Sequence, residues 1–415
     1  MLGRLKRRIV SLRWYLIARG FLTPPTYAEG ARLTPKRLLN LYLGRYHFMR
    51  GDTKLRSHPT RLTVEPTNVC NLRCPGCFTG VGETGRERSF MSLDLYRRLL
   101  AELGDYLLEI EFYNWGEPLL SKDVYTMIRD ASQRGIGTIV STNFSMPFDA
   151  GRAEQLVASG LTTLGVSLDG ASQASYEQYR VRGSLERVLD NCRLVNEAKR
   201  KLNAATPRMV WEFHVFEHNV DDIETAKAMA RDLDMEIAIS KGWVDGPDWQ
   251  PPGHVVREIG PDVPARFPCT YLWEKAVVNN DGGVAPCCGA FYDEDDFAQL
   301  KVGAADLGAA TFMSVWNNES YQQARALFTA REGPESARKL ICFDCPVTVS
   351  WERYKQHQAA GGRPEDFKGD HSFNDGFIYF FNRRHLFGGE AIDLQPVDVP
   401  TQAAADVAGG SSLPV

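Results

Sequence analysis

Three cysteines in the first quarter of the chain have the spacing C-x3-C-x2-C: Cys70, Cys74 and Cys77. They directly follow a short, strand-like run that begins at Arg61. Four thiolates saturate a 4Fe–4S cube, so three leave one iron open to bind a substrate or a cofactor. Zinc held by three sulfurs and a water is the alternative. A disulfide is disfavoured because three neighbouring cysteines leave one unpaired.

A second group of cysteines lies in the last third of the chain. Two β-like runs around the Asn-Asp-Gly-Gly turn at 280–283 predict a hairpin, and a C-x2-C pair follows much later. Four thiolates from a hairpin and a loop can bind zinc or another 4Fe–4S cluster, and the spacing alone leaves both open. If both sets bind zinc, the chain is a non-catalytic scaffold for a partner. The cysteines concerned are Cys269, Cys287, Cys288, Cys342 and Cys345.

Strand-like and helix-like segments alternate between residues 61 and 245. Short apolar runs rich in β-branched or aromatic residues predict strands, and Ser92 and Asn219 are predicted N-caps of the first and last helices. The pattern predicts a parallel sheet curved into a partial βα barrel, whose chemistry lies at the carboxyl ends of the strands. Strands are expected at 62–65, 109–113, 138–141, 163–168, 209–216 and 236–240, and helices at 93–103, 124–134, 152–158, 185–201 and 221–233.

The first cysteine set, placed after the first strand, resembles the signature of the radical SAM enzymes. The hairpin with its double cysteine and the late C-x2-C pair resemble an abbreviated SPASM domain. The resemblance implies an α/β fold, a six-stranded partial βα (TIM-like) barrel with a small C-terminal cysteine-rich SPASM-like domain. It also implies that the open iron of the first 4Fe–4S cluster binds S-adenosylmethionine. Reductive cleavage of that cofactor then gives a 5′-deoxyadenosyl radical, which abstracts hydrogen from a substrate.

The resemblance assigns ligands and a reductant as well. Cys70, Cys74 and Cys77 hold the first cluster, and an electron donor such as flavodoxin or ferredoxin reduces it. One auxiliary 4Fe–4S cluster is implied in the SPASM-like region, with Cys287 aligning better than Cys288. Its implied ligands are Cys269, Cys287, Cys342 and Cys345. Three positions depart from the family pattern. Gly76 stands where an aromatic residue is usual, Trp115 replaces the first glycine of a Gly-Gly-Glu-Pro motif, and Phe144 replaces the glycine of a Thr-Asn-Gly motif.

Polar residues after the second, third and fourth expected strands are candidates for cofactor binding. The resemblance implies that the Gly-Glu-Pro segment at 116–118 holds the methionine amino group. It also implies that a serine and an arginine after the fourth strand bind the ribose and carboxylate region, and an arginine fork suits a carboxylate. The alternatives are a turn with a local hydrogen bond and a surface ion pair. The candidates are Gly116, Glu117, Asn143, Ser167, Asp169 and Arg180.

The fifth expected strand places Glu212 and His214 on one face, because side chains alternate along a strand. Strands of a parallel barrel are usually apolar on both faces. Two ionisable residues on one face therefore predict a polar interior site, with Glu212 and His214 as candidate catalytic residues. A satisfied structural pair is the alternative.

Composition limits the class of protein. The chain has 415 residues, 43% of them hydrophobic, and a formal net charge of −4, as in an ordinary globular protein without the basic excess of a nucleic-acid binder. Nine clustered cysteines without a secretory signal favour a reducing compartment, so we expect a cytoplasmic protein. Residues 1–20 carry six basic side chains among large apolar ones, and no acidic residue precedes Glu29. Such a segment lies on the inner face of a membrane or docks on its own protein.

The expected organisation follows from these patterns. The substrate is not encoded in any recognisable motif, so a sugar, a lipid, another small molecule and a peptide all stay open. Six parts are expected: a basic helical extension (1–60), the barrel (61–245), a Pro-rich linker (246–268), the cysteine domain (269–350), an aromatic-rich segment (351–387) and a disordered tail (388–415).

Overall fold

The structure is a computed structural model that describes residues 29–242, 244, 249–253, 255, 269, 271–300, 311–329 and 334–360. The expectations for residues 1–20, for most of the Pro-rich linker and for residues 361–415 lie outside this part of the chain. Among the described residues, no helix is long and apolar enough to cross a membrane.

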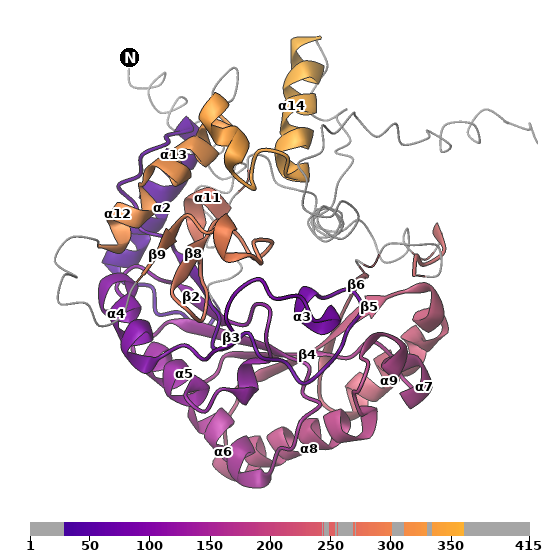
Figure 1. Cartoon of the computed structure of the whole chain (residues 1–415). Helices are drawn as coiled ribbons and strands as arrows, with labels where there is room; N and C mark the ends of the chain where they lie inside the picture. The colour runs from indigo at the N-terminus through magenta and orange to yellow at the C-terminus, as the bar shows by residue number, and fades with distance from the viewer. Residues whose placement is uncertain are drawn as a thin grey trace, which may run out of the picture. The chain divides into compact units, whose positions relative to one another are not determined.

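The core is a nine-stranded sheet in the order β6-β5-β4-β3-β2-β1-β7-β8-β9 (Figure 1). Its first six strands in the chain are parallel, which confirms the predicted α/β architecture with the sheet of a partial barrel. These strands are β1 (Arg61–Val64), β2 (Glu109–Phe112), β3 (Gly137–Thr142), β4 (Thr163–Ser167), β5 (Arg208–Val215) and β6 (Glu236–Lys241).

Helices connect the parallel strands and cover one face of the sheet. Along β5, Trp211 and Phe213 are fully buried, whereas the alternating Glu212 and His214 are partly exposed. One face of the sheet is therefore apolar and lies against helices, and the other face is polar. The connecting helices are α4 (Leu93–Leu103), α5 (Val124–Gln133), α6 (Ala150–Ala158), α7 (Gln173–Tyr179), α8 (Leu185–Leu202) and α9 (Ile223–Asp232).

The C-terminal cysteine region continues the same sheet. β7 (Lys275–Val278) pairs in parallel with β1, and it forms the predicted antiparallel hairpin with β8 (Gly283–Ala285). The buried Lys275 side chain lies against Glu111 on β2, an ion pair that joins β7 to the barrel. The sequence predicted the hairpin, and its docking on β1 is an additional finding. β9 (Ala298–Gln299), α12 (Phe312–Trp316) and α13 (Glu319–Ala326) follow.

Local signals explain one success and two errors. The Ser92 side chain accepts a hydrogen bond from the backbone of Leu95, which confirms the predicted N-cap of α4. The Asn219 prediction is wrong: α9 begins after Asp222, and the Asn219 amide donates to the carbonyls of Asp169 and His214. An asparagine in a sequence indicates that its side chain forms a hydrogen bond to nearby backbone, but it does not show which backbone group is the partner. α7 was not predicted, because seven residues are too few for a clear helical period.

We expect Leu164→Ala to lower the free energy of unfolding by about 2–5 kcal/mol, because it opens a cavity in the apolar face of β4. Leu164 is fully buried, and the control Leu202→Ala changes a leucine that is 42% exposed. Denaturant unfolding of both variants measures the effect. Equal losses for the two leucines would contradict the described packing.

Candidate active site

The first three cysteines lie in the loop between β1 and the short helix α3 (Phe78–Val81). Burial raises the pKa of the Cys70 thiol to about 12 and those of Cys74 and Cys77 to about 11, and the three thiols also raise one another's pKa. Thiolates this buried require a cationic partner, which the irons of a cluster provide. The donor set therefore fits a three-thiolate cluster. Gly80 keeps the loop compact, because a Cβ there would clash with the Cys74 backbone.

The loops after β2 and β3 meet beside Cys70. The Glu117 carboxylate accepts hydrogen bonds from the Thr142 hydroxyl at 2.7 Å, from the Asn143 backbone N–H at 2.7 Å and from the Leu119 N–H at 3.0 Å. The Asn143 amide nitrogen lies 3.6 Å from Cys70 Sγ. Burial raises the pKa of Glu117 to about 7, although these donors lower it. A carboxylate has about four acceptor positions, so one stays available for a cationic ligand group.

Close backbone approach explains the glycine of this loop. A Cβ on Gly116 would clash with the carbonyl of Thr67, three residues before Cys70. The next residue, Glu117, donates its backbone N–H to the Val69 carbonyl at 2.9 Å. Gly116 therefore lets the β2 loop lie directly on the cysteine loop.

The ends of β4 and β5 carry a chain of charged groups toward Cys74. Asp169 Oδ2 lies 2.5 Å from Arg180 Nε, and Asp169 Oδ1 lies 3.0 Å from His214 Nδ1. Arg180 Nη1 in turn lies 3.9 Å from Cys74 Sγ. Burial alone would raise the pKa of Asp169, but Arg180 and His214 hold it below its usual range. The ion pair fixes the guanidinium beside the cysteine loop.

The polar face of the sheet presents a carboxylate at mid-strand. Glu212 Oε2 accepts from the Ser141 hydroxyl at 2.7 Å and from the Ser167 hydroxyl at 3.2 Å. A Cβ on Gly165 would clash with the other oxygen, Oε1, so the glycine gives this side chain its space. Three neighbouring strands thus place one carboxylate and two hydroxyls together, on the same face as His214.

The five later cysteines interact with one another beside the hairpin. Cys269, Cys287 and Cys345 all raise the pKa of the Cys342 thiol, in addition to the larger effect of burial. Cys288 raises the pKa of Cys287 and of Cys269, and its Sγ lies 3.6 Å from the Tyr271 hydroxyl. No three described His, Cys, Asp or Glu side chains surround a point that could hold a single metal ion.

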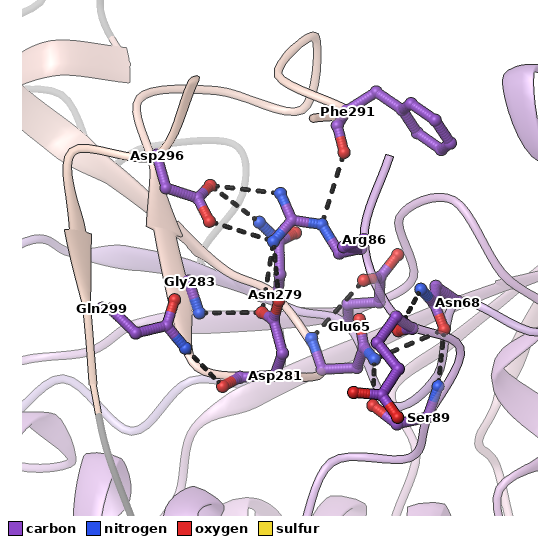
Figure 2. A network of polar contacts seen from close by, with 12 residues as sticks. Glu65, Asn68, Arg86, Ser89, Asn279, Asp281, Gly283, Phe291, Asp296 and Gln299 are labelled. Carbon is purple, nitrogen blue, oxygen red and sulfur yellow. Dashed lines mark hydrogen bonds and ion pairs between the residues drawn. The ribbon is translucent and has the colours of Figure 1, made fainter. Parts of the chain in front are cut away.

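A polar network joins the segment after the first cysteines to the hairpin turn (Figure 2). Arg86 lies between Asp281 and Asp296, with ion-pair distances of 3.1 and 2.9 Å, and its Nε donates to the Phe291 carbonyl. Its side chain is only 2% exposed. Two carboxylates and one carbonyl therefore fix the hairpin turn against this segment.

Glu65, at the end of β1, joins three parts of the site (Figure 2). Its Oε1 accepts from the Trp115 backbone N–H at 2.8 Å, and its Oε2 accepts from the Asn280 N–H at 3.4 Å. Burial raises the pKa of Glu65 to about 7, although both donors lower it. One carboxyl thus links β1, the loop after β2 and the hairpin.

Aromatic rings occupy the space beside Cys77. Phe78 stacks on Phe291 with ring centroids 4.9 Å apart, and Trp115 lies 5.3 Å from Phe78. Cys77 packs on this cluster. Two of the departures from the family pattern lie in one region, since Trp115 packs on Phe78, which follows the loop that carries Gly76.

The structure connects Glu117 and Asn143 to Cys70, and it connects Asp169, Arg180 and His214 to Cys74. Glu212 and Ser167 contact each other on the polar face. Glu65, Arg86 and Thr142 are additional polar residues in these networks. The sequence could have identified Glu65 as a site residue, because it is an acidic residue directly after a buried strand. Arg86 gave none, because its partners lie about two hundred residues later in the chain.

The sequence pattern of the radical SAM superfamily matches residues 64–211, and that of the SPASM iron–sulfur cluster-binding domain matches residues 269–346. The chain belongs to the radical SAM superfamily and carries a C-terminal SPASM domain. In fold it is similar to SuiB of Streptococcus suis bound to S-adenosylmethionine, with a TM-score of 0.55 and 15% identity over 75% of this chain and 78% of that chain.

The curated relatives of this radical SAM enzyme differ in what they do. The Fe-coproporphyrin III synthase of Methanosarcina barkeri is 28% identical over 34% of this chain and 38% of its own length. The mycofactocin maturase of Mycolicibacterium smegmatis is 25% identical over 44% of each chain. The chain thus spans less than half the length of either protein. Family membership establishes radical SAM chemistry with iron–sulfur binding and leaves the substrate open.

We expect Glu65→Gln to change how stability depends on pH. Because the pKa of Glu65 in the folded chain is about 7, above the ordinary 4.5, the folded chain binds the extra proton near neutrality. The contribution of this carboxyl to the free energy of unfolding then falls as the pH rises through 7. Glutamine does not titrate, so the variant should gain about 1 kcal/mol relative to wild type between pH 6 and pH 8.

Denaturant unfolding at both pH values measures this gain. Glu186→Gln on α8, which changes an exposed glutamate, is the control for the chemical substitution. A constant difference between Glu65→Gln and wild type across this range would show that Glu65 titrates as an ordinary carboxyl.

Proposed function

We propose that Cys70, Cys74 and Cys77 hold the cluster at which this enzyme cleaves S-adenosylmethionine. With an open iron, such a cluster supplies the reductive cleavage that yields a 5′-deoxyadenosyl radical able to abstract hydrogen. The observation that carries the proposal is the position of three neighbouring thiols, Cys74 buried and the other two partly buried, at the carboxyl end of β1, where β2, β3 and β4 also deliver polar groups.

The chain's own residues bind and orient the cofactor in this proposal. Glu117 is held by three donors and can still accept from the methionine ammonium, beside the close backbone approach at Gly116. Arg180, fixed by Asp169, offers its fork to a carboxylate. Asn143 lies against Cys70, and Ser167 ends β4 on the polar face. Each group ends or follows one of the parallel strands, which supports one shared site.

The substrate in this proposal binds on the polar face of the sheet. A carboxylate that faces two serine hydroxyls suits a substrate with hydroxyl or ammonium groups, because such groups donate hydrogen bonds. Glu212 is the proposed anchor or base, and His214 a proposed proton carrier oriented by Asp169. This arrangement favours a sugar, a polar small molecule or a peptide over the acyl part of a lipid.

The auxiliary site completes the proposal. Cys269, Cys287, Cys342 and Cys345 are the proposed ligands of one auxiliary 4Fe–4S cluster, and the effect of the other three thiols on the pKa of Cys342 supports this choice. A cluster with four protein thiolates has no open iron, so electron transfer is the chemistry that it supplies. Membership of an iron–sulfur family favours this function over a zinc scaffold.

Other expectations stay proposals. Radical SAM enzymes need a reductant, and flavodoxin or ferredoxin is the proposed donor in a cytoplasmic setting. In this proposal residues 61–245 bind the cofactor and the substrate, and residues 269–350 bind the auxiliary cluster. Nucleic acid is not a proposed partner, given the formal net charge of −4.

Replacing Cys70, Cys74 and Cys77 together with alanine should abolish formation of 5′-deoxyadenosine from S-adenosylmethionine under dithionite. It should also remove about four irons per chain after anaerobic reconstitution, the content of one cube. Chromatography and iron analysis measure the two effects. Cys192→Ala, which changes the buried cysteine of α8, is the matched control and should keep both properties. Continued cleavage by the triple variant would refute the assignment.

Replacing Cys342 and Cys345 together should remove the auxiliary irons and leave S-adenosylmethionine cleavage in place, since neither residue lies in the cysteine loop of β1. Iron analysis should again show a loss of about four irons per chain. Full iron content would reject the auxiliary ligand set, and zinc at this site in the wild type would favour the scaffold role.

A further inference from the structure

Helix α2 (Pro35–Arg50) presents an apolar stripe to solvent. Leu39 is 71% exposed, and Tyr46 and Met49 are each 43% exposed. Leu33, just before the helix, is also 43% exposed. These four make up nearly half of the exposed large hydrophobic residues in the described part of the chain, so the exposed apolar surface is concentrated on one element.

The opposite face of α2 is firmly attached to the protein. The buried Arg37 side chain donates to four backbone carbonyls, among them those of Gly104 and Arg134. Phe48 packs edge-on against Trp273 of α11 (Tyr271–Glu274), with centroids 5.6 Å apart. The exposed stripe is therefore the outer side of a helix in a fixed position.

Basic residues outnumber acidic ones in the part of the sequence that contains α2. Residues 1–51 contain eleven Lys and Arg and a single acidic residue, Glu29, in a chain whose formal net charge is −4. The described acidic groups near α2 are already paired: Asp105 with Lys36 at 2.7 Å, Asp52 with His47 at 2.7 Å, and Glu29 with Arg208 at 3.3 Å. A partner for this surface must be both anionic and receptive to apolar side chains.

We propose that the exposed face of α2 is a docking surface for an anionic lipid bilayer. The stripe enters the region between headgroups and acyl chains, and the exposed Arg32, just before the helix, contacts lipid phosphates. In the sequence, residues 1–28 contain six further Lys and Arg. That segment is an unsuitable cover for the stripe, because α2 itself contains no acidic residue to attract it. This proposal goes beyond the radical chemistry and places the enzyme beside a membrane surface.

The test uses the full chain, reconstituted anaerobically, and sucrose-loaded vesicles of equal parts phosphatidylglycerol and phosphatidylcholine. We expect Leu39→Glu combined with Met49→Glu to lower the partition coefficient roughly tenfold or more, through lost apolar burial and added repulsion. Leu202→Glu, on an exposed leucine of α8, is the matched control and should bind as wild type does. Wild-type binding should fall at high salt and on vesicles of phosphatidylcholine alone.

Two results would overturn the proposal. One is equal binding by wild type and the double variant. Another is equal binding by wild type to both kinds of vesicle. A double variant that loses DNA binding while wild type never sediments with vesicles would assign the surface to nucleic acid, which also contradicts it.

Discussion

Strand β1 is the element on which the rest of the structure depends. It pairs in parallel with β2 on one side and with β7 on the other. Its carboxyl end leads through Glu65 into the loop of Cys70, Cys74 and Cys77. A parallel neighbour must end at the same edge of a sheet. The pairing with β7 therefore brings the hairpin turn to the edge that carries the first cysteines, and one continuous sheet connects the two cysteine-bearing regions.

One face of that sheet stabilises the fold, and the other carries polar residues. Burial of large apolar side chains such as Trp211 and Phe213 stabilises the helix-covered face, by roughly 1.5–3 kcal/mol for each side chain. That stability offsets polar residues on the other face, where Glu212 is held by two hydroxyls and Glu111 by Lys275. A buried carboxylate without such partners would cost several kcal/mol. The polar face is tolerated because each charge described there has a neighbour that compensates it.

Sequence patterns predicted the parts of this molecule that depend on neighbours in the chain. The period of two in β5 placed Glu212 and His214 on one face, and the residues just before Leu93 identified Ser92 as a cap. Patterns failed where a partner lies far along the chain. Nothing local to Arg86 indicates two aspartates some two hundred residues later, and nothing in β7 indicates β1 as its neighbour. The choice between Cys287 and Cys288 as a cluster ligand likewise depends on where each side chain points. Two cysteines that are adjacent in the sequence do not reveal this direction.

The link between the cysteine loop and the hairpin is better understood as a positioning device than as a source of stability. A buried ion pair gains little over well-packed apolar groups, because both charges lose their hydration. Loss of one partner is far more costly, since it leaves a charge buried and unpaired. Arg86, 2% exposed between Asp281 and Asp296, is in that situation, and Glu65 holds two backbone N–H groups from different segments. Such a network tolerates only one arrangement of its parts, so it fixes where the hairpin lies relative to the first cysteines. Electron transfer between two clusters would require such a fixed separation.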